Sequence, residues 1–516
     1  MLNPLPPGGR CFPLLARQRG QALAFIGVTT VVLLLGLLLL YNVAQLTTQK
    51  MKLQNTADAA AYSGAVTEAR DYNFTAYANR AMIANQVAVA QIVGLRSWAR
   101  NLDSTYKSGP FNWVPQTFAS LSALGSMWTS VWNVAKSAAG GIESVMNAVA
   151  GPLITVLDFL IDAFYYGSTA YHAATALSLW VEIIPEVIRQ NDPDASLSTS
   201  LTQIGFGAKH VYDVYNFTSD YDPTKSGTTG GSDSVSGGSQ DRQANVIFNS
   251  QDGFYNFRSY PWPLPMLIDP TKAIPGNFGT MFMIMYHSGG TELKNKTGTY
   301  MKSWTGADST GLFTILMVWI FVPFPVPIPI PIPTPQGYGA ALAGSANDLQ
   351  PGSGNFNHNF AEAYGSAFVN PLTMAPAWIN VGNGTGATLD SNGGLKKYWD
   401  VTDRAQATAT AHQNISGPEL LIEVEKPMST IAISSSPSMN IGGGDTGQLW
   451  LADGTEGNTI KALSKGQSYF ARPKKLFARG DGKTEYGSLY SPYWQARLMH
   501  NNLLEQGASI LSQTFP

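Results

Sequence analysis

The longest apolar run in the chain is Ala22–Tyr41, and no charged side chain occurs between Gln21 and Gln49. A helix of about twenty residues rises ~30 Å, which is the thickness of the hydrocarbon core of a bilayer. A cleaved secretory signal has a shorter apolar core, of about 7–15 residues, followed by a small-residue cleavage site. Asn42-Val43-Ala44 is a poor site of this kind. The pattern therefore predicts a retained transmembrane anchor over residues 21–45.

The charges that flank this anchor predict its orientation. Arg10, Arg17 and Arg19 precede it with no acidic residue among them, and the first lysine after it is Lys50. Segments on the cytoplasmic side of a membrane carry the excess of Lys and Arg. We therefore expect a cytoplasmic N-terminal segment, residues 1–20, in a single-pass protein whose bulk lies on the other side of the membrane.

The segment after the anchor carries a helical pattern. No proline occurs from Gln21 to Ser108, so we expect one very long helix, or two helices with a bend near 71–73. Alanines recur at four-residue spacing: Ala57, Ala61, Ala65 and Ala69. Residues four apart lie on one helix face, so these alanines form a ridge that allows another helix to approach closely. That helix is either the chain's own next helix or a partner's, and the sequence leaves both open.

Residues 112–190 are rich in Ala, Leu, Val and Trp and predict three or four apolar helices. Breaks are expected at Gly140-Gly141, Gly151-Pro152 and Pro185. A second membrane span is disfavoured because Asp158 and Asp162 lie in its middle, and a carboxylate at bilayer depth costs ~2.5–3.5 kcal/mol. A buried bundle helix with one polar stripe fits better. We therefore expect residues 46–222 to form a helical region.

The second half of the chain has a mixed pattern. Residues 223–241 are almost free of apolar side chains, which is typical of a flexible Gly/Ser loop. Strand-like runs follow between Gly, Asn and Pro turns, at 244–250, 281–287 and 419–427. We expect residues 242–516 to form a mixed α+β region. The predicted fold class is α+β, in which an N-terminal transmembrane helix continues into a long helix and a helical bundle, followed by a β-rich region.

Prolines occupy every second position from Pro323 to Pro335, with Phe, Val, Ile or Thr between them. Proline breaks a helix and donates no backbone hydrogen bond, so this segment fits neither a helix nor a central strand. We expect an extended polyproline-like rod of about 40 Å, at ~3.1 Å per residue. Its apolar residues either pack on the protein's own surface or dock on a partner or the bilayer.

Composition narrows the class of protein. Only 13% of residues are charged, against roughly 25% in an average soluble protein, and Gly, Ser, Thr and Asn are abundant. This favours an exported bacterial protein. The formal net charge is −2, so no basic surplus indicates nucleic-acid binding. The single cysteine, Cys11, precedes the anchor, so no disulfide can form within the chain and no cysteine-based metal site is possible.

Two short motifs flank the anchor: Arg19-Gly20-Gln21-Ala22 before it and Leu53–Ala65, LQNTADAAAYSGA, after it. In this order they resemble the N-terminal segment of TadE/TadG-like (Tad domain) proteins of Flp, or tight adherence, pilus assembly. The residues that carry the resemblance are Arg19, Gly20, Gln21, Gln54, Ala57, Asp58, Ala61, Gly64 and Ala65. Two later stretches, 79–91 and 491–498, are similar to features of long Tad-domain proteins.

The resemblance implies a bacterial inner-membrane protein with its larger part in the periplasm. Such a protein serves pilus assembly or an associated secretion machine and has no enzymatic activity of its own. Its partners would be the membrane and other pilus-assembly proteins, with homo- or hetero-oligomers formed through the anchor and the Ala-rich helix. The alternative is a large pseudopilin, cut after Gly20 as type IV prepilins are, although Phe25 stands where prepilins carry a glutamate.

The sequence contains no recognisable catalytic constellation, and its six histidines lack metal-ligand spacing such as His-x-x-x-His. Glu419, Glu423 and Glu425 alternate as surface charges along a strand-like run rather than forming an acid/base pair. Asp194–Ser198 has the letters of a von Willebrand A metal site but follows a polar helical segment, so a helix-terminating loop capped by Asp or Ser is expected. We expect no catalytic, cofactor or metal site. A membrane-tethered enzyme acting on envelope polymers is the other hypothesis, because active-site residues can be far apart in sequence.

Overall fold

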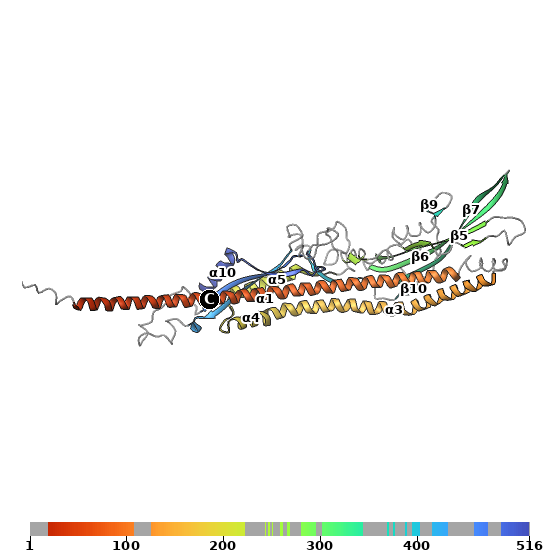
Figure 1. The fold of residues 1–516 in the computed structure, drawn as a ribbon. Helices are drawn as coiled ribbons and strands as arrows, with labels where there is room; N and C mark the ends of the chain where they lie inside the picture. Colours follow the sequence, from red (N-terminus) through yellow and green to blue (C-terminus); the bar gives the residue numbers. More distant parts are fainter. Residues whose placement is uncertain are drawn as a thin grey trace, which may run out of the picture.

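The protein is an elongated rod built on one long helix (Figure 1). A computed structural model describes residues 19–107, 125–221, 243, 246–247, 250, 258–261, 266–268, 280–295, 302–322, 324–343, 369–370, 375–376, 387–389, 395–402, 415–431, 459–472 and 487–514. In the strands between 258 and 389 it describes the backbone, together with the side chains of Thr291 and Trp304. Residues 1–18 and the expected loop at 223–241 lie outside the described residues.

Helix α1 (Arg19–Lys107) runs without interruption for 89 residues, which confirms the expectation of one very long helix. No break occurs near 71–73. Helix α3 lies beside it along much of the rod (Figure 1). The other helices are α3 (Gly125–Ser178), the π turn η1 (Leu179–Ile183), α4 (Ile184–Asn191), α5 (Leu201–Phe217), the 3-10 turn η4 (Met428–Thr430) and α10 (Leu503–Thr514).

Helix α3 corrects the expectation of three or four separate helices, because it continues through two predicted breaks. Gly140-Gly141 and Gly151-Pro152 lie inside it. Ala150 and Ile154 are buried against α1 on either side of the second break, and this packing offsets the cost of Gly and Pro in a helix, about 1 and 3 kcal/mol. The third break coincides with the start of α4, where Pro185 follows the π turn. Proline donates no hydrogen bond to the preceding turn, which suits a changed bonding pattern there.

Two largely antiparallel sheets lie along α1, in the orders β1-β12-β13-β14 and β10-β7-β6-β5-β3, with β4 also paired to β5. Two short pairs, β2 with β11 and β8 with β9, complete the described strands. The bounds are β1 (Ser196–Leu197), β2 (Thr218–Tyr221), β3 (Arg258–Pro261), β4 (Met266–Ile268), β5 (Thr280–Asn295), β6 (Lys302–Val322), β7 (Phe324–Ala343), β8 (Val369–Asn370), β9 (Ala375–Pro376), β10 (Ala387–Leu389), β11 (Tyr398–Val401), β12 (Ser416–Pro427), β13 (Thr459–Phe470) and β14 (Trp494–Met499).

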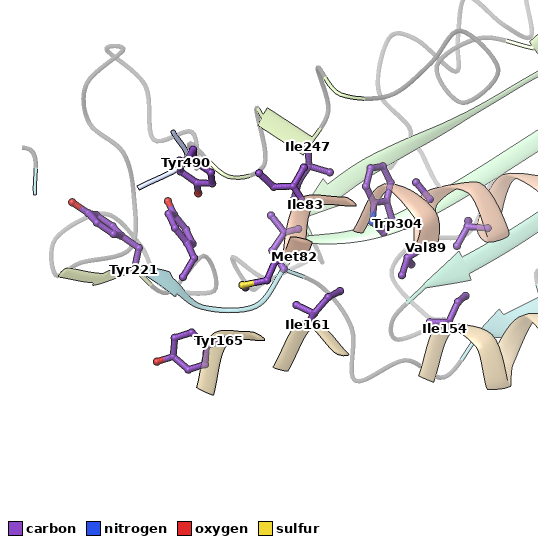
Figure 2. Packing of buried hydrophobic residues seen from close by; sticks show 14 of the residues in the cluster. Met82, Ile83, Val89, Ile154, Ile161, Tyr165, Tyr221, Ile247, Trp304 and Tyr490 are labelled. Atoms are coloured by element: carbon purple, nitrogen blue, oxygen red, sulfur yellow. The ribbon is translucent and has the colours of Figure 1, made fainter. Parts of the chain in front are cut away.

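These elements confirm the α+β class and the strand character of 281–287 and 419–427. The run 244–250 differs from the expected strand, because residues 243, 246 and 247 are helical. The Ile247 side chain is buried in a cluster with α1 and α3 (Figure 2). A short apolar run does not distinguish a strand from a buried helical segment, since both place it in a core.

The proline-rich segment is extended as expected, but it is a paired strand on the protein's own β6 rather than a polyproline-like rod. Strand β7 pairs antiparallel with β6, in a register that places Pro331 opposite Ile315 and Ile330 opposite Leu316. Residues in an antiparallel pair alternate between hydrogen-bonded and non-hydrogen-bonded positions. Prolines at every second position can therefore all occupy the class whose backbone nitrogen points away from β6. Among the described strands β10 pairs only with the end of β7, Ala341–Ala343, so the proline-bearing part is an edge.

The largest core cluster joins the two long helices to the elements above them (Figure 2). From α1 it contains Met82, Ile83 and Val89, and from α3 Ile154, Ile161 and Tyr165. Trp304 of β6 packs in the same cluster and donates its ring N–H to Gln86 Oε1 at 3.2 Å. The rod is therefore held together along its length by side chains of α1, and every other layer is attached to that helix.

Candidate functional site

The first functional feature is the N-terminal part of α1, whose apolar side chains are exposed and pack against no other element among the residues that the structure describes. Residues 22–34 are all exposed, and the most apolar 18-residue window of α1 contains no buried residue. Thr29 and Thr30 donate their hydroxyls to the carbonyls of Phe25 and Ile26, each at 2.8 Å. Polar groups satisfied within the helix are what a lipid environment requires. This segment is a candidate membrane span by length and composition, and the helical stretch 133–191 is a second.

The second feature is a face of α1 that begins shortly after this span, which we call the docking face. It consists of Leu53, Ala57, Ala60, Ala61 and Ala65, all with no exposed surface, together with Gly64. Leu53 and the alanines at 57, 60 and 61 form one core cluster with Leu179 and with Leu420, Ile422 and Val424 of β12. The alanine ridge thus packs within the chain, against a sheet as well as α4.

The contact with the sheet is close enough to require glycine. A Cβ atom placed on Gly466 of β13 would lie 2.2 Å from the carbonyl oxygen of Ala61 and 3.2 Å from Cβ of Ala65. A Cβ atom on Gly64 would lie 2.3 Å from a methyl group of Leu420. Helix backbone and strand backbone therefore touch, as small residues on both elements allow. The alanine spacing correctly predicted a close approach, but its main partner is a strand rather than a helix.

Polar residues on the edge of the docking face fix the register of the sheet. The Gln54 amide donates to Asp58 Oδ1 at 2.9 Å and to the carbonyl of Leu463 at 3.1 Å. Because Leu463 lies on β13, this pair connects the motif directly to a strand 409 positions later in the chain. If β13 shifted along α1, the hydrogen bond from Gln54 to the carbonyl of Leu463 would be lost. Gln54 and Asp58 therefore have a structural role, which is to fix the position of the strand on the helix.

A buried ion cluster lies at the start of the docking face. Lys426 of β12, 2% exposed at its side chain, lies 3.0 Å from Asp192, which is fully buried. Lys52 of α1 bonds the same carboxylate at 3.0 Å. Burial raises the pKa of Asp192, but the hydrogen bonds and charges of Lys426 and Lys52 outweigh that effect and lower it. The cluster ties α1, β12 and the loop after α4 together.

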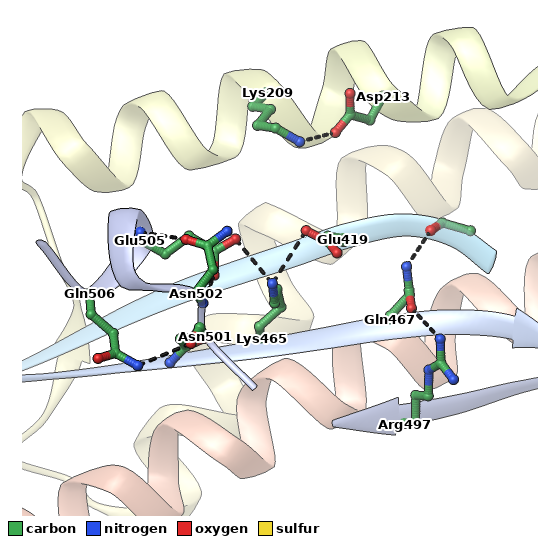
Figure 3. A network of polar contacts seen from close by, with 11 residues as sticks. Lys209, Asp213, Glu419, Lys465, Gln467, Arg497, Asn501, Asn502, Glu505 and Gln506 are labelled. Atoms are coloured by element: carbon green, nitrogen blue, oxygen red, sulfur yellow. Dashed lines mark hydrogen bonds and ion pairs between the residues drawn. The ribbon is translucent and has the colours of Figure 1, made fainter. Parts of the chain in front are cut away.

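The outer face of the same sheet is covered by α10 (Figure 3). Lys465, the neighbour of Gly466, points to this side and pairs with Glu505 at 3.0 Å and Glu419 at 3.4 Å. Asn502 and Glu505 exchange hydrogen bonds of 2.7 and 2.8 Å between side chain and backbone, a capping box that begins α10. Glu423 is also buried, next to Lys461 at 3.6 Å, which corrects its expected surface position. The sheet is thus enclosed between helices.

Above the docking face, two carboxylate–histidine pairs connect α1 to the helices beside it. Glu68 bonds His210 of α5, and Asp71 bonds His172 of α3. They line a cavity of about 50 Å³ together with Tyr72 and apolar residues. Burial lowers the pKa of His172, but its bond to Asp71 and the charge of that group outweigh this and raise it. Because each carboxylate bonds one of the two histidines, we interpret these residues as a polar layer between the helices rather than as a binding site.

Farther along, asparagines of α1 bind the segment before β14. Asn73 accepts from the backbone N–H of Trp494 at 3.0 Å and donates to its carbonyl at 2.9 Å. Asn79 donates to the carbonyl of Leu489 at 2.7 Å, and Arg80 to that of Tyr490 at 2.6 Å. The two stretches that resemble long Tad-domain proteins, 79–91 and 491–498, therefore lie in the same region of the rod.

Asp194–Ser198, which resembles the sequence of a von Willebrand A metal site, does not have the geometry of such a site in the described part of the chain. Ser196–Leu197 is a two-residue strand, and Asp194 lies 3.4 Å from the ammonium of Lys426. The loop joins α4 to α5, whose N-cap Ser200 accepts from the backbone N–H of Gln203. The expected loop after a helix is present, because α4 ends at Asn191, but the capping serine is Ser200, which lies outside Asp194–Ser198 and begins α5. The structure finds no group of three or more His, Cys, Asp or Glu that could hold a metal among the residues it describes.

Of the nine motif residues singled out from the sequence, six lie on or beside the docking face: Gln54, Ala57, Asp58, Ala61, Gly64 and Ala65. Arg19, Gly20 and Gln21 lie at the other end of the span, some 33 residues or ~50 Å away along the helix. The two motifs are therefore not brought together. Sequence reasoning missed Gly466, Lys426 and Asp192. An isolated glycine inside a strand, as at Gly466, is the signal that could have located the close approach on the strand side.

The docking face and the span before it are also what known proteins share with this chain. Residues 20–67 match the model of the Tad family, described as putative Flp pilus-assembly TadE/G-like. The resemblance predicted from the two motifs is confirmed over this Tad segment. It begins at the second residue of α1 and ends next to Glu68, so it contains the span and the docking face but not the carboxylate–histidine layer. Comparisons with curated proteins and with solved structures found no significant match.

Proposed function

We propose that this chain is a non-enzymatic, membrane-anchored component of Tad/Flp-type pilus assembly or of an associated secretion machine. The observation that carries the proposal is the position of the Tad segment, residues 20–67. Its first half is an exposed apolar helix, and its second half packs in the core of the protein's own fold. A segment that is half exposed span and half packed helix supports a role in anchoring the body and holding it away from the membrane.

The proposed mechanism is positional. Helix α1 leaves the inner membrane and continues as the spine on which the sheets and α3 are mounted, so the body is held at a fixed distance from the bilayer. The excess of arginines before the span supports a cytoplasmic N-terminus and a periplasmic body in a single-pass topology. The rod would then present its far end, with β5, β6 and β7, to pilus components that lie away from the membrane (Figure 1).

Two measurements test the anchor. The mass of the N-terminal peptide of protein purified from its native membrane should correspond to an uncut chain, and a chain that begins at Gln21 would support the pseudopilin instead. A reporter enzyme that is active only in the periplasm should be active when it is fused after Pro516. A fluorescent protein that folds only in the cytoplasm should stay dark at the same position, and bright fluorescence there would refute the topology.

A third measurement tests the partners. Crosslinking in intact cells, followed by purification of the chain, should recover other components of the pilus-assembly machinery. The matched control is a variant in which Lys426 is replaced, K426M, because its sheet is loosened from α1 while the anchor is unchanged. If unrelated soluble proteins were captured equally by both forms, pilus assembly would be the wrong process.

A further inference from the structure

Helix α3 has its polar side turned inward. The residues that face α1 recur at three- and four-residue spacing: Ala150, Ile154, Asp158, Ile161, Tyr165 and Ser168. The acidic and basic residues between 144 and 181 are Asp158, Asp162 and His172, and all are buried or half-buried. Asp162 pairs with Lys396 at 3.2 Å and His172 with Asp71. These pairings turn the acidic and basic groups of Asp162 and His172 away from the outer side of the helix.

The outer side is apolar along its whole length. We call it the α3 stripe and define it by Val145, Val149, Val156, Phe159, Tyr166 and Leu177, which are between 43% and 71% exposed. No exposed residue from 144 to 181 is charged, and the structure describes every side chain in this range. A surface helix of a soluble monomer shows the opposite arrangement, with charged residues facing water. A continuous exposed apolar face of this kind marks an interaction surface.

The size of the α3 stripe fits a protein partner. From Val145 to Leu177 the helix rises about 48 Å, and half of a cylinder with a radius of ~5 Å and this length has an area of roughly 750 Å². A standard protein interface buries about 800 Å² on each partner. The stripe alone therefore supplies the area that a stable dimer needs.

Its position excludes the bilayer as the occupant, an argument that rests on the retained anchor of the proposed function. The pair Asp71–His172 lies about 30 residues beyond Tyr41, or ~45 Å along α1. From there α3 extends farther away, since Arg96 bonds Asn147 at 3.0 Å. Most of the stripe thus lies tens of ångströms beyond the hydrocarbon core. Every copy anchored in one membrane carries its stripe at the same height.

We propose that the α3 stripe is a self-association surface, which packs against the α3 stripe of a second copy of this chain standing parallel to it in the same membrane. A twofold axis parallel to the rods brings each position near its own equivalent. Such an interface is sensitive to like charges, because every charged position would meet itself. The stripe contains none, and the small residues Ala163, Gly167, Ala170 and Ala174 on the same exposed side allow the two helices to approach closely.

Site-specific disulfide crosslinking in native membranes tests this. The full chain carries Cys11→Ser and one new cysteine, either Val156→Cys or Tyr166→Cys, and is oxidised with copper phenanthroline. The control is Leu504→Cys on α10, which is 85% exposed and apolar but lies on the other side of the molecule. We expect at least tenfold more covalent dimer from each stripe variant than from the control. Equal yields from all three, or crosslinks only to a different protein, would overturn the proposal.

A second variant separates association from folding. Val156→Lys places a charge at the centre of the stripe, on a side chain that is already 55% exposed, and Val156→Ala is its matched control. In lipid nanodiscs we expect native mass spectrometry to show dimers for the wild type and V156A and monomers for V156K, with identical thermal unfolding. A wild type that is monomeric while its N-terminus is uncut and its body periplasmic refutes self-association alone and leaves the proposed function standing.

Discussion

The contact between Gly466 and the Ala61 backbone gives the sharpest prediction. In Gly466→Ala the new methyl group would lie 2.2 Å from the carbonyl oxygen and 2.8 Å from the carbonyl carbon of Ala61. These are backbone atoms of a long helix, so neither can rotate away, and strand β13 must move outward as a whole. Overpacking of a core costs about 1–3 kcal/mol. Because backbone meets backbone we expect the upper end, about 3 kcal/mol lower free energy of unfolding.

The assay is denaturant unfolding of the full chain in detergent, followed by tryptophan fluorescence, with Gly205→Ala as the matched control. Gly205 lies inside α5, and a Cβ atom there would meet nothing within 4 Å. Alanine is favoured over glycine in a helix by about 0.5–1 kcal/mol, so the control should be slightly more stable than the wild type. If G466A unfolded at the same denaturant concentration as the wild type, the sheet would not rest on the helix as closely as described.

Three further changes test the polar interior by the same assay. Asp192→Asn removes the fully buried carboxylate that pairs with Lys426 and leaves this lysine, among the described residues, only the carboxylate of Asp194, at 3.4 Å and half exposed, so it should cost about 3 kcal/mol. The exposed control Glu186→Gln should change nothing measurable, and equal effects would contradict the ion cluster. Burial raises the pKa of Asp158 to about 6. Its charge therefore costs stability at pH 7, and Asp158→Asn should add about 1–2 kcal/mol after allowance for solvent screening. This gain must shrink as the pH falls from about 6 and vanish below about pH 4, where the carboxyl group is protonated in both the folded and the unfolded chain. Because the pKa of His172 is raised above 6.5, its contribution is complete below that pH and is lost as the pH rises through the folded value. His172→Gln should remove this decline, and an unchanged slope would rule His172 out as its source.

The pattern of apolar and polar residues correctly predicted those features that depend only on residues close together in the sequence. The apolar run from Ala22 to Tyr41, the long helix after it and the four-residue alanine spacing all depend on side chains within a few turns of one another. The prediction of helix breaks within α3 was wrong, because packing of α3 on α1 outweighs the free-energy cost of Pro152 inside a helix. The strand predicted at 244–250 failed because a run that short fits either type of core element. Helix and strand propensities alone could not predict either result, because each depends on packing against α1.

The candidate site was only half predictable, and for a physical reason. Gln54 and Asp58 were singled out by resemblance, but their partner is a carbonyl on β13, and any of several apolar strands offers such a carbonyl. The buried Lys426 has no signature in a sequence either, since lysine is normally a surface residue. Its carboxylate lies 234 positions earlier, in a loop with the letters of a metal motif. Pairings of this kind become visible only when the strands have been placed.

The edge of β7 has a consequence for crowded membranes. A free strand edge normally offers a ladder of backbone donors to which a neighbouring chain can add its own strand, and uncontrolled addition ends in aggregates. Along the stretch that includes Pro331, every second residue is a tertiary amide, so such a ladder has no regular set of rungs. The β7 edge therefore offers no regular ladder, so a neighbouring copy has little to pair with along this side of the sheet.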